Sequence, residues 1–298
     1  MDYNMFKEVI LDGMREIFSE DTECSIHEVL KNNGVRLDGL VINTKENKVS
    51  PTIYLNDFYN SFLGGMEIED ILEEIERVFK DNQLDKSYDA SNLMNFNESK
   101  KKIAYKLINY EMNKELLKDI PHRKYLDLAV VYFIVIRDQH IENATVLINN
   151  KWIEEWKITE EDLYNIAREN SPQMFKAEIV NIKDMVISLL EEKTDDTTIL
   201  PDADCNMYVL TNQDKQYGAA TILYENIISD FAKKNNSNIY ILPSSIHELI
   251  LVPGNSLVPK EGLNDMVKEV NATQVPIQEI LSDHAYIYNI GDDSITFC

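Results

Sequence analysis

Two short apolar runs that flank a polar turn, within residues 238–253, constrain the fold of this chain more than any other feature. Residues 239–242 and 249–252 are rich in β-branched side chains and bounded by turn formers, which is typical of buried strands. Pro243 fixes its φ angle and donates no backbone hydrogen bond, so we place it at a strand end. Residues 243–248 are therefore predicted to reverse the chain beside a sheet.

Paired strands with amphipathic helices between them are predicted along the whole chain. Residues 24–43 and 285–297 contain apolar runs around glycine-containing turns, which predicts two hairpins. Further strands are predicted at 49–55, 103–110, 124–136, 144–148 and 207–211, and helices at 2–19, 57–63, 68–79, 113–118, 159–170, 179–190, 218–234 and 263–270. Hairpins separated by helices predict an α+β fold with mixed or antiparallel sheets and helices packed on them, in two lobes.

A change in composition suggests where the lobes meet. The stretch EEKTDDTTILPDAD is acidic and nearly free of large apolar side chains. We therefore expect an N-terminal α+β lobe at 1–190, an acidic linker or exposed loop at 191–205, and a C-terminal α+β lobe at 206–298.

The charge of the chain limits its partners. It has 52 acidic and 29 basic residues, a net charge of −23, so nucleic acid and anionic membrane surfaces are poor partners. Residues 56–85 combine an apolar helix face with an acidic one that only Arg77 and Lys80 oppose. This acidic face is either a solvated outer surface or a docking surface for a basic protein partner.

The cysteines and the apolar runs bear on location. Cys24, Cys205 and Cys298 form no CxxC pair, so neither a zinc ribbon nor a disulfide framework is indicated. The first residues lack the basic and apolar regions of a signal peptide, and the longest apolar run, at 128–136, is too short to cross a bilayer. A cytoplasmic location is the expectation.

Hydroxyls, an imidazole and a carboxylate gather at the predicted polar turn. Its side chains are Ser244, Ser245, His247 and Glu248, and His284 supplies a second imidazole. A nucleophilic serine needs a base within hydrogen-bond reach and an acid to orient that base, so these residue types suit a hydrolase. Against this, no G-x-S-x-G elbow occurs, and strand alternation separates His247 from Glu248. The alternative is a polar turn that only closes the fold.

A second candidate is an anion site at Gly218, Ala219 and Ala220, which follow a predicted strand and open a predicted helix. Neither GxxxxGK[ST] nor GxGxxG is present, so close packing of helix on sheet is the competing interpretation. The chain also lacks an H-E-x-x-H motif. We expect no metal and no cofactor.

Several long segments of the sequence resemble those of a known family. They are NNGVRLDGL, SPTIYL, NYEMNKELLKDIPHRKYLDLAVVY, ITEEDLYNIARENSP, LPSSIHELILVP and KEVNATQVPIQEILSDHAYIY. With these segments the chain resembles an uncharacterised bacterial domain-of-unknown-function family typical of gut anaerobes, and residues 123–170 and 206–252 are more distantly similar to the YtpQ-like family. These resemblances imply one family unit and a soluble bacterial protein, and they supply no catalytic residue.

The leading hypothesis is a non-catalytic binding or adaptor protein that meets a protein partner through an acidic surface. It rests on the charge and on the lack of a catalytic or cofactor motif. The first alternative is a hydrolase-like enzyme that uses the 244–248 turn with His284. The second is an acidic mimic of nucleic acid that occupies a basic protein groove.

Overall fold

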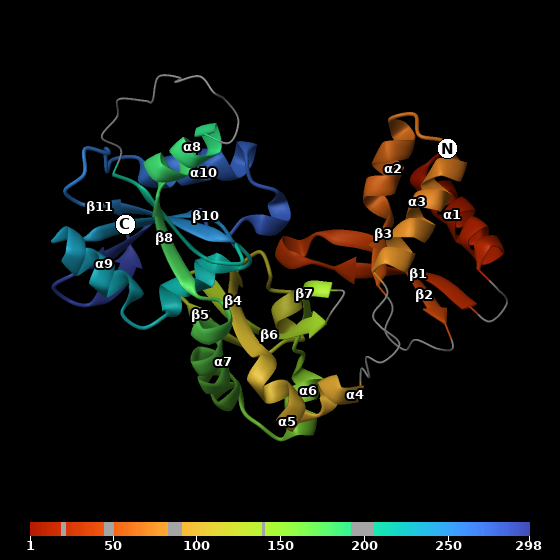
Figure 1. The fold of residues 1–298 in the computed structure, drawn as a ribbon, viewed down its shortest axis with the longest axis horizontal. Coiled ribbons are helices and arrows are strands. Elements are labelled where there is room, and N and C mark those ends of the chain that lie inside the picture. Colours follow the sequence, from red (N-terminus) through yellow and green to blue (C-terminus); the bar gives the residue numbers. More distant parts are fainter. Residues whose placement is uncertain (19–21, 45–50, 83–90, 139–140, 192–205) are drawn as a thin grey trace.

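The chain folds into three antiparallel sheets with helices packed on them, as seen in the computed structural model in Figure 1. The structure describes residues 1–18, 22–44, 51–82, 91–138, 141–191 and 206–298. The predicted α+β class is confirmed, and every strand pairing in these ranges is antiparallel.

The N-terminal unit, residues 3–81, is a small sheet covered by three helices. Its elements are α1 (Tyr3–Ile17), β1 (Thr22–Leu30), β2 (Arg36–Thr44), β3 (Thr52–Tyr54), α2 (Leu55–Leu63) and α3 (Ile68–Asp81), with strand order β1-β2-β3. Phe6, Ile10 and Met14 of α1 pack with Ile71 and Ile75 of α3. This unit therefore has a hydrophobic core of its own.

The middle sheet forms the centre of the molecule. Its strands are β4 (Ile103–Asn109), β5 (His122–Tyr125), β6 (Leu128–Asp138) and β7 (Ile141–Leu147), and β6 pairs with the other three. Its helices are α4 (Ser91–Met94), α5 (Phe96–Ser99), α6 (Asn150–Trp156) and α7 (Glu160–Met174). A capping box begins α7, with hydrogen bonds in both directions between Thr159 and Asp162.

The C-terminal sheet has six strands in the order β13-β12-β10-β11-β9-β8. These strands are β8 (Ala177–Asn181), β9 (Tyr208–Asn212), β10 (Ile239–Ser245), β11 (Glu248–Pro253), β12 (Tyr286–Asn289) and β13 (Ser294–Phe297); the helices are α8 (Ile182–Glu191), α9 (Ile227–Asn235) and α10 (Leu263–Thr273). The largest core cluster joins this sheet to the middle sheet. The strand pair predicted on either side of 243–248 is confirmed as β10 and β11.

The predicted linker lies mostly outside the described residues, and strand pairing crosses it. β8 precedes it, β9 follows it, and the two strands pair over residues 177–181. Residues on both sides of the stretch at 191–205 thus belong to one sheet.

Some predicted boundaries differ because a strand or a turn replaces helix. The helix predicted at 179–190 begins as β8 and becomes α8 at Ile182. The helix predicted at 218–234 is split into a 3₁₀ turn at Gly218–Leu223 and α9, since Asn226 between them has φ 64. The strand predicted at 124–136 is a hairpin, because Leu126 at φ 53 turns β5 into β6.

Two prolines also differ from expectation. Pro243 lies inside β10 opposite Leu249, and its missing N–H is tolerated because β12 pairs only with residues 239–241 of that strand. Pro172 lies in the last turn of α7 rather than ending it, where it removes a single helical hydrogen bond. On α10, Val267 is buried, whereas Met266 is 46% exposed.

The tip of the β1–β2 hairpin, residues 31–34, connects the N-terminal unit to the rest of the molecule (Figure 1). Asn33 is buried at φ 57, a conformation that asparagine tolerates better than most residues. Its N–H donates to Asn113 Oδ1 (2.8 Å), and its Oδ1 accepts from Asn113 Nδ2 (2.7 Å). Its Nδ2 donates to the carbonyls of Ile277 and Ile280, both at 2.7 Å. One asparagine thus joins the hairpin tip to the turn after β4 and to the segment at 277–280.

We expect Asn33→Gly to weaken this docking by about 2–4 kcal/mol, since the positive φ is kept while three side-chain hydrogen bonds are lost. Hydrogen–deuterium exchange of residues 27–36 and 276–281 should become faster. Asn236→Gly is the matched control, because Asn236 has φ 49 and is exposed. Equal exchange in the two variants would contradict the prediction.

Candidate functional site

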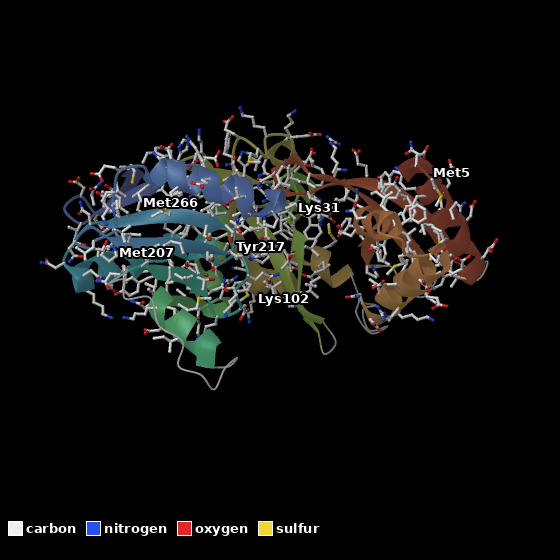
Figure 2. The ribbon with its side chains drawn as sticks, turned by 90° about the horizontal axis from the view of Figure 1, so that it is seen from above. Met5, Lys31, Lys102, Met207, Tyr217 and Met266 are labelled. Carbon is white, nitrogen blue, oxygen red and sulfur yellow. The ribbon has the colours of Figure 1, made fainter. Side chains whose placement is uncertain are left out.

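A central cavity of about 480 Å³ lies where the three parts of the fold meet. Figure 2 shows Lys31 and Tyr217, which both line it, between the N-terminal unit and the C-terminal sheet. The hairpin tip covers one side, and the β10–β11 corner with residues 276–279 forms another. A cavity of this size suits a small molecule.

The floor of the central cavity is one face of the middle sheet. Strand side chains alternate between faces, so every second residue of β4, β6 and β7 points to the same side. The side chains of this face that line the cavity are Lys106, Ile108, Val131, Phe133, Thr145 and Leu147. The opposite face, with Tyr105 and Leu107, belongs to the main core. The pattern IAYKLIN thus places one ammonium group on a mostly apolar floor.

Tyr217 enters the cavity from the turn that follows β9. Its φ is 54, which is an outlier for a large side chain and is found most often at functional sites. Gly218 fixes this turn, because a Cβ there would lie 2.4 Å from the His247 carbonyl oxygen and 2.2 Å from Thr211 Oγ1. The Tyr217 ring stacks on His247, with centroids 5.7 Å apart, and meets Phe133 edge-on at 5.3 Å.

Two lysines surround the Tyr217 phenol. Lys106 Nζ lies 4.2 Å from the ring centroid, and the Lys106 ammonium and the Thr145 hydroxyl are polar side-chain groups beside the phenol. Burial alone would raise the pKa of Tyr217. The Lys106 ammonium, the Thr145 hydroxyl and the more distant Lys31 outweigh burial, so the pKa lies below its ordinary value.

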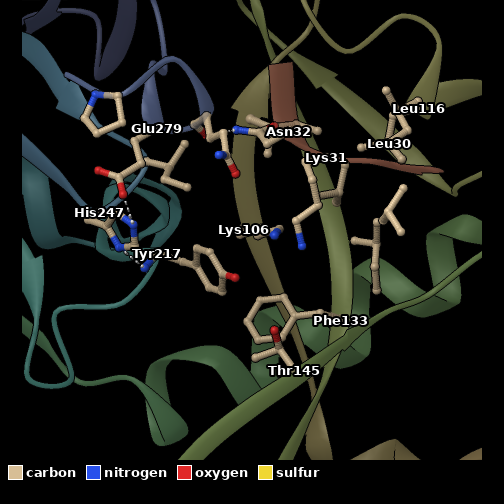
Figure 3. A pocket seen from close by; sticks show the side chains of 17 residues that line it. Leu30, Lys31, Asn32, Lys106, Leu116, Phe133, Thr145, Tyr217, His247 and Glu279 are labelled. Atoms are coloured by element: carbon tan, nitrogen blue, oxygen red, sulfur yellow. Dashed lines mark hydrogen bonds and ion pairs between the residues drawn. The ribbon is translucent and has the colours of Figure 1, made fainter. Parts of the chain in front are cut away.

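Neither lysine has a carboxylate partner among the described residues. Lys31 Nζ donates to Tyr54 Oη at 2.7 Å, and Lys106 Nζ lies over the Tyr217 ring. Figure 3 shows both ammonium groups in the middle of the cavity, with the Tyr217 hydroxyl turned toward them. The chemistry of this centre favours a negative charge on whatever occupies it.

His247 and Glu279 form the polar end of the cavity. The imidazole Nδ1 accepts a hydrogen bond from the Tyr217 N–H at 3.2 Å, so its Nε2 faces Glu279 Oε1 at 3.9 Å (Figure 3). The backbone of this end is fixed, since the Ile246 N–H donates to the Glu279 carbonyl at 2.9 Å. His247 is therefore held in a defined orientation with one ring nitrogen toward the cavity.

The serines of the predicted hydrolase site are bonded elsewhere. Ser244 Oγ donates to Glu248 Oε1 at 3.2 Å, and Ser245 Oγ accepts from the backbone N–H of His247 at 3.0 Å. Within the described structure, neither hydroxyl contacts the His247 imidazole. Of these residues only His247 lines the central cavity.

His284 lies at a different place in the fold. Its ring packs against Phe297 with centroids 5.5 Å apart, and it lines a separate pocket of about 270 Å³ with Asn264 and Cys298. The structure thus does not bring His284 to the 244–248 corner. A serine, base and acid relay is not assembled there.

The Gly218, Ala219 and Ala220 segment is buried and forms a short 3₁₀ turn. The Ala219 N–H donates to the Ile246 carbonyl, and the Ala220 N–H donates to the Tyr217 carbonyl. These groups are therefore engaged within the chain. The geometry favours the packing interpretation, and the cations that suit an anion lie nearby on Lys31 and Lys106.

A second cavity, of about 670 Å³, lies between α7 and residues 223–227. Two cations line it: Arg168, which is paired with Glu225, and Lys176. Among the described residues no group of three or more His, Cys, Asp or Glu side chains lies close enough to hold a metal ion. Within the same residues no helix is long and apolar enough to cross a membrane.

Sequence reasoning missed Lys31, Lys106 and Tyr217 as a group. Lys106 was detectable, because it is the single charge in an otherwise apolar strand segment. Tyr217 precedes Gly218, which was considered for an anion site or for packing, without regard to the side chain before it. Lys31 had no local signal, since its role depends on how the hairpin tip docks.

We expect Lys106→Met to raise the pKa of Tyr217, because the ammonium that opposes the effect of burial is removed. Tyrosinate absorbance followed against pH measures this, with Tyr217→Phe identifying the contribution of residue 217. Lys268→Met, an exposed lysine, is the control and should leave the titration unchanged. A wild-type curve in K106M would show that Lys106 does not set the pKa of this phenol.

Comparison with known proteins supplies a family and no function. No curated protein and no solved structure matches this chain. The match to a protein family covers residues 3–290, which is nearly the whole sequence and includes all three sides of the central cavity. The chain belongs to a family of unknown function, DUF5688.

Proposed function

We propose that this protein is a non-catalytic binding protein that takes up a small anionic molecule in the central cavity. One observation carries the proposal: the ammonium groups of Lys31 and Lys106 face the same cavity, and neither is paired with a carboxylate of the described residues. The phenol of Tyr217, the hydroxyl of Thr145 and the imidazole of His247 add hydrogen-bonding groups beside them.

Lys31 and Lys106 differ from the surface cations that form ion pairs, such as Arg36, Lys80 and Arg168, because they face one cavity together. Two ammonium groups that share a cavity repel each other, and a bound anion removes that repulsion while forming charge-assisted hydrogen bonds.

A basic protein partner is the second candidate, and the acidic face of α3 favours it. This helix buries Ile71, Ile75 and Phe79 and exposes Glu69, Asp70 and Glu73 to solvent. Such a face suits electrostatic steering of a basic protein, either as an adaptor surface or as a mimic of nucleic-acid charge. A salt-dependent complex that is lost when Glu69, Asp70 and Glu73 become glutamine would support it.

We expect Lys106→Met to weaken the binding of an anionic apolar probe, anilinonaphthalene sulfonate, by roughly 10- to 100-fold, the usual worth of a charge-assisted hydrogen bond. Fluorescence titration measures the affinity. Lys268→Met should bind like the wild type, because that lysine is exposed and remote from the cavity lining. Equal affinity of K106M and wild type would refute a site at Lys106.

A further inference from the structure

The central cavity has three chemically different regions in a row. Figure 3 shows the ammonium groups of Lys31 and Lys106 in the middle, His247 with Glu279 on one side, and Leu30 with Leu116 on the other. An occupant that matches all three regions must carry an anion between an apolar group and a group that suits a carboxylate. A ligand of this kind rests on the proposed function and would specify which class of anion the cavity binds.

The apolar region is continuous with a buried cluster. Ile108 and Val131 are 1% and 0% exposed, and Leu116 and Leu147 pack against them while still lining the cavity. Leu30 closes this region from the hairpin tip side. Aliphatic side chains on the floor and the cover favour an aliphatic group of the ligand, which loses contact with water on entry.

The acidic region consists of one carboxylate. Glu279 ends the 3₁₀ turn Ile277–Glu279, lines the cavity, and among the described residues forms an ion pair only with His247, at 3.9 Å. That pair exists only while the imidazole is protonated. With a neutral imidazole, Glu279 is a carboxylate at the cavity wall that lacks a cation, which suits a ligand ammonium group.

The three regions together define a ligand. We infer that the central cavity binds a small aliphatic zwitterion, either an amino acid or a dipeptide with aliphatic side chains. Its carboxylate lies between Lys31, Lys106 and the Tyr217 hydroxyl. Its ammonium group pairs with Glu279, and its side chain lies against Leu30, Leu116 and Leu147. A cavity of about 480 Å³ is large enough for either form.

Calorimetric titration with four probes tests this inference: leucine, leucyl-leucine, 4-methylpentanoate and isopentylamine. The third probe is leucine without its ammonium group, and the fourth is leucine without its carboxylate. We expect leucine or leucyl-leucine to bind at least about tenfold more tightly than either single-charge probe. Glu279→Gln should remove the advantage over 4-methylpentanoate and leave the binding of 4-methylpentanoate itself unchanged.

Glu248→Gln is the matched control, because Glu248 lies at the same corner and pairs with Ser244 outside the cavity lining. It should keep the preference for the zwitterion. If 4-methylpentanoate binds as tightly as leucine and leucyl-leucine, and Lys106→Met weakens all three, the inference is wrong and the anion site stands. If no probe binds and anilinonaphthalene sulfonate binds K106M and wild type equally, both the inference and the proposed function fail.

Discussion

The hydrogen bonds of Asn33 hold the β1–β2 hairpin tip against the rest of the molecule, and the central cavity depends on this docking. Asn33 uses its backbone N–H and its whole side-chain amide on partners from the turn after β4 and from residues 277–280. Buried amide groups are costly to leave unpaired, so each of these hydrogen bonds favours the docked tip. The N-terminal unit has a separate core, so these contacts hold the unit to the rest of the molecule and do not form its core.

The hairpin tip also explains why the central cavity exists. Val29, Leu30 and Lys31, at the end of β1 and the start of the tip, lie across the central cavity from the middle-sheet face that carries Lys106. Lys31 directly precedes the docked Asn32 and Asn33, so docking brings a second ammonium group to the one on the sheet. If the proposed anion site exists, it includes Lys31 only when the hairpin tip is docked, so the proposal implies that ligand binding and docking are coupled.

The sequence predicted the elements of the fold well where the pattern was local. The hairpin around residues 243–248, the hairpin near the end and the capping box at Thr159 follow from alternation, turn formers and spacing. Where the pairing of strands distant in sequence determined the local structure, the predicted element was wrong. β8 became a strand because β9 pairs with it, and Pro243 entered β10 because the neighbouring strand is too short to need its N–H.

The candidate site also depends on contacts between residues that are distant in sequence, which local patterns do not reveal. His247 was singled out for the serines beside it, yet its ring contacts come from Tyr217 and Glu279, which are 30 and 32 positions away. The hydroxyls of the two neighbouring serines bind within the corner itself: Ser244 donates to Glu248, and Ser245 accepts from the backbone. A tight corner is closed by hydrogen bonds of its own polar side chains. The strained Tyr217 turn then fixes the phenol where two lysines lower its pKa. The corner at 244–248 is thus formed by residues that are close in sequence, whereas the lining of the central cavity is formed by residues that are distant in sequence.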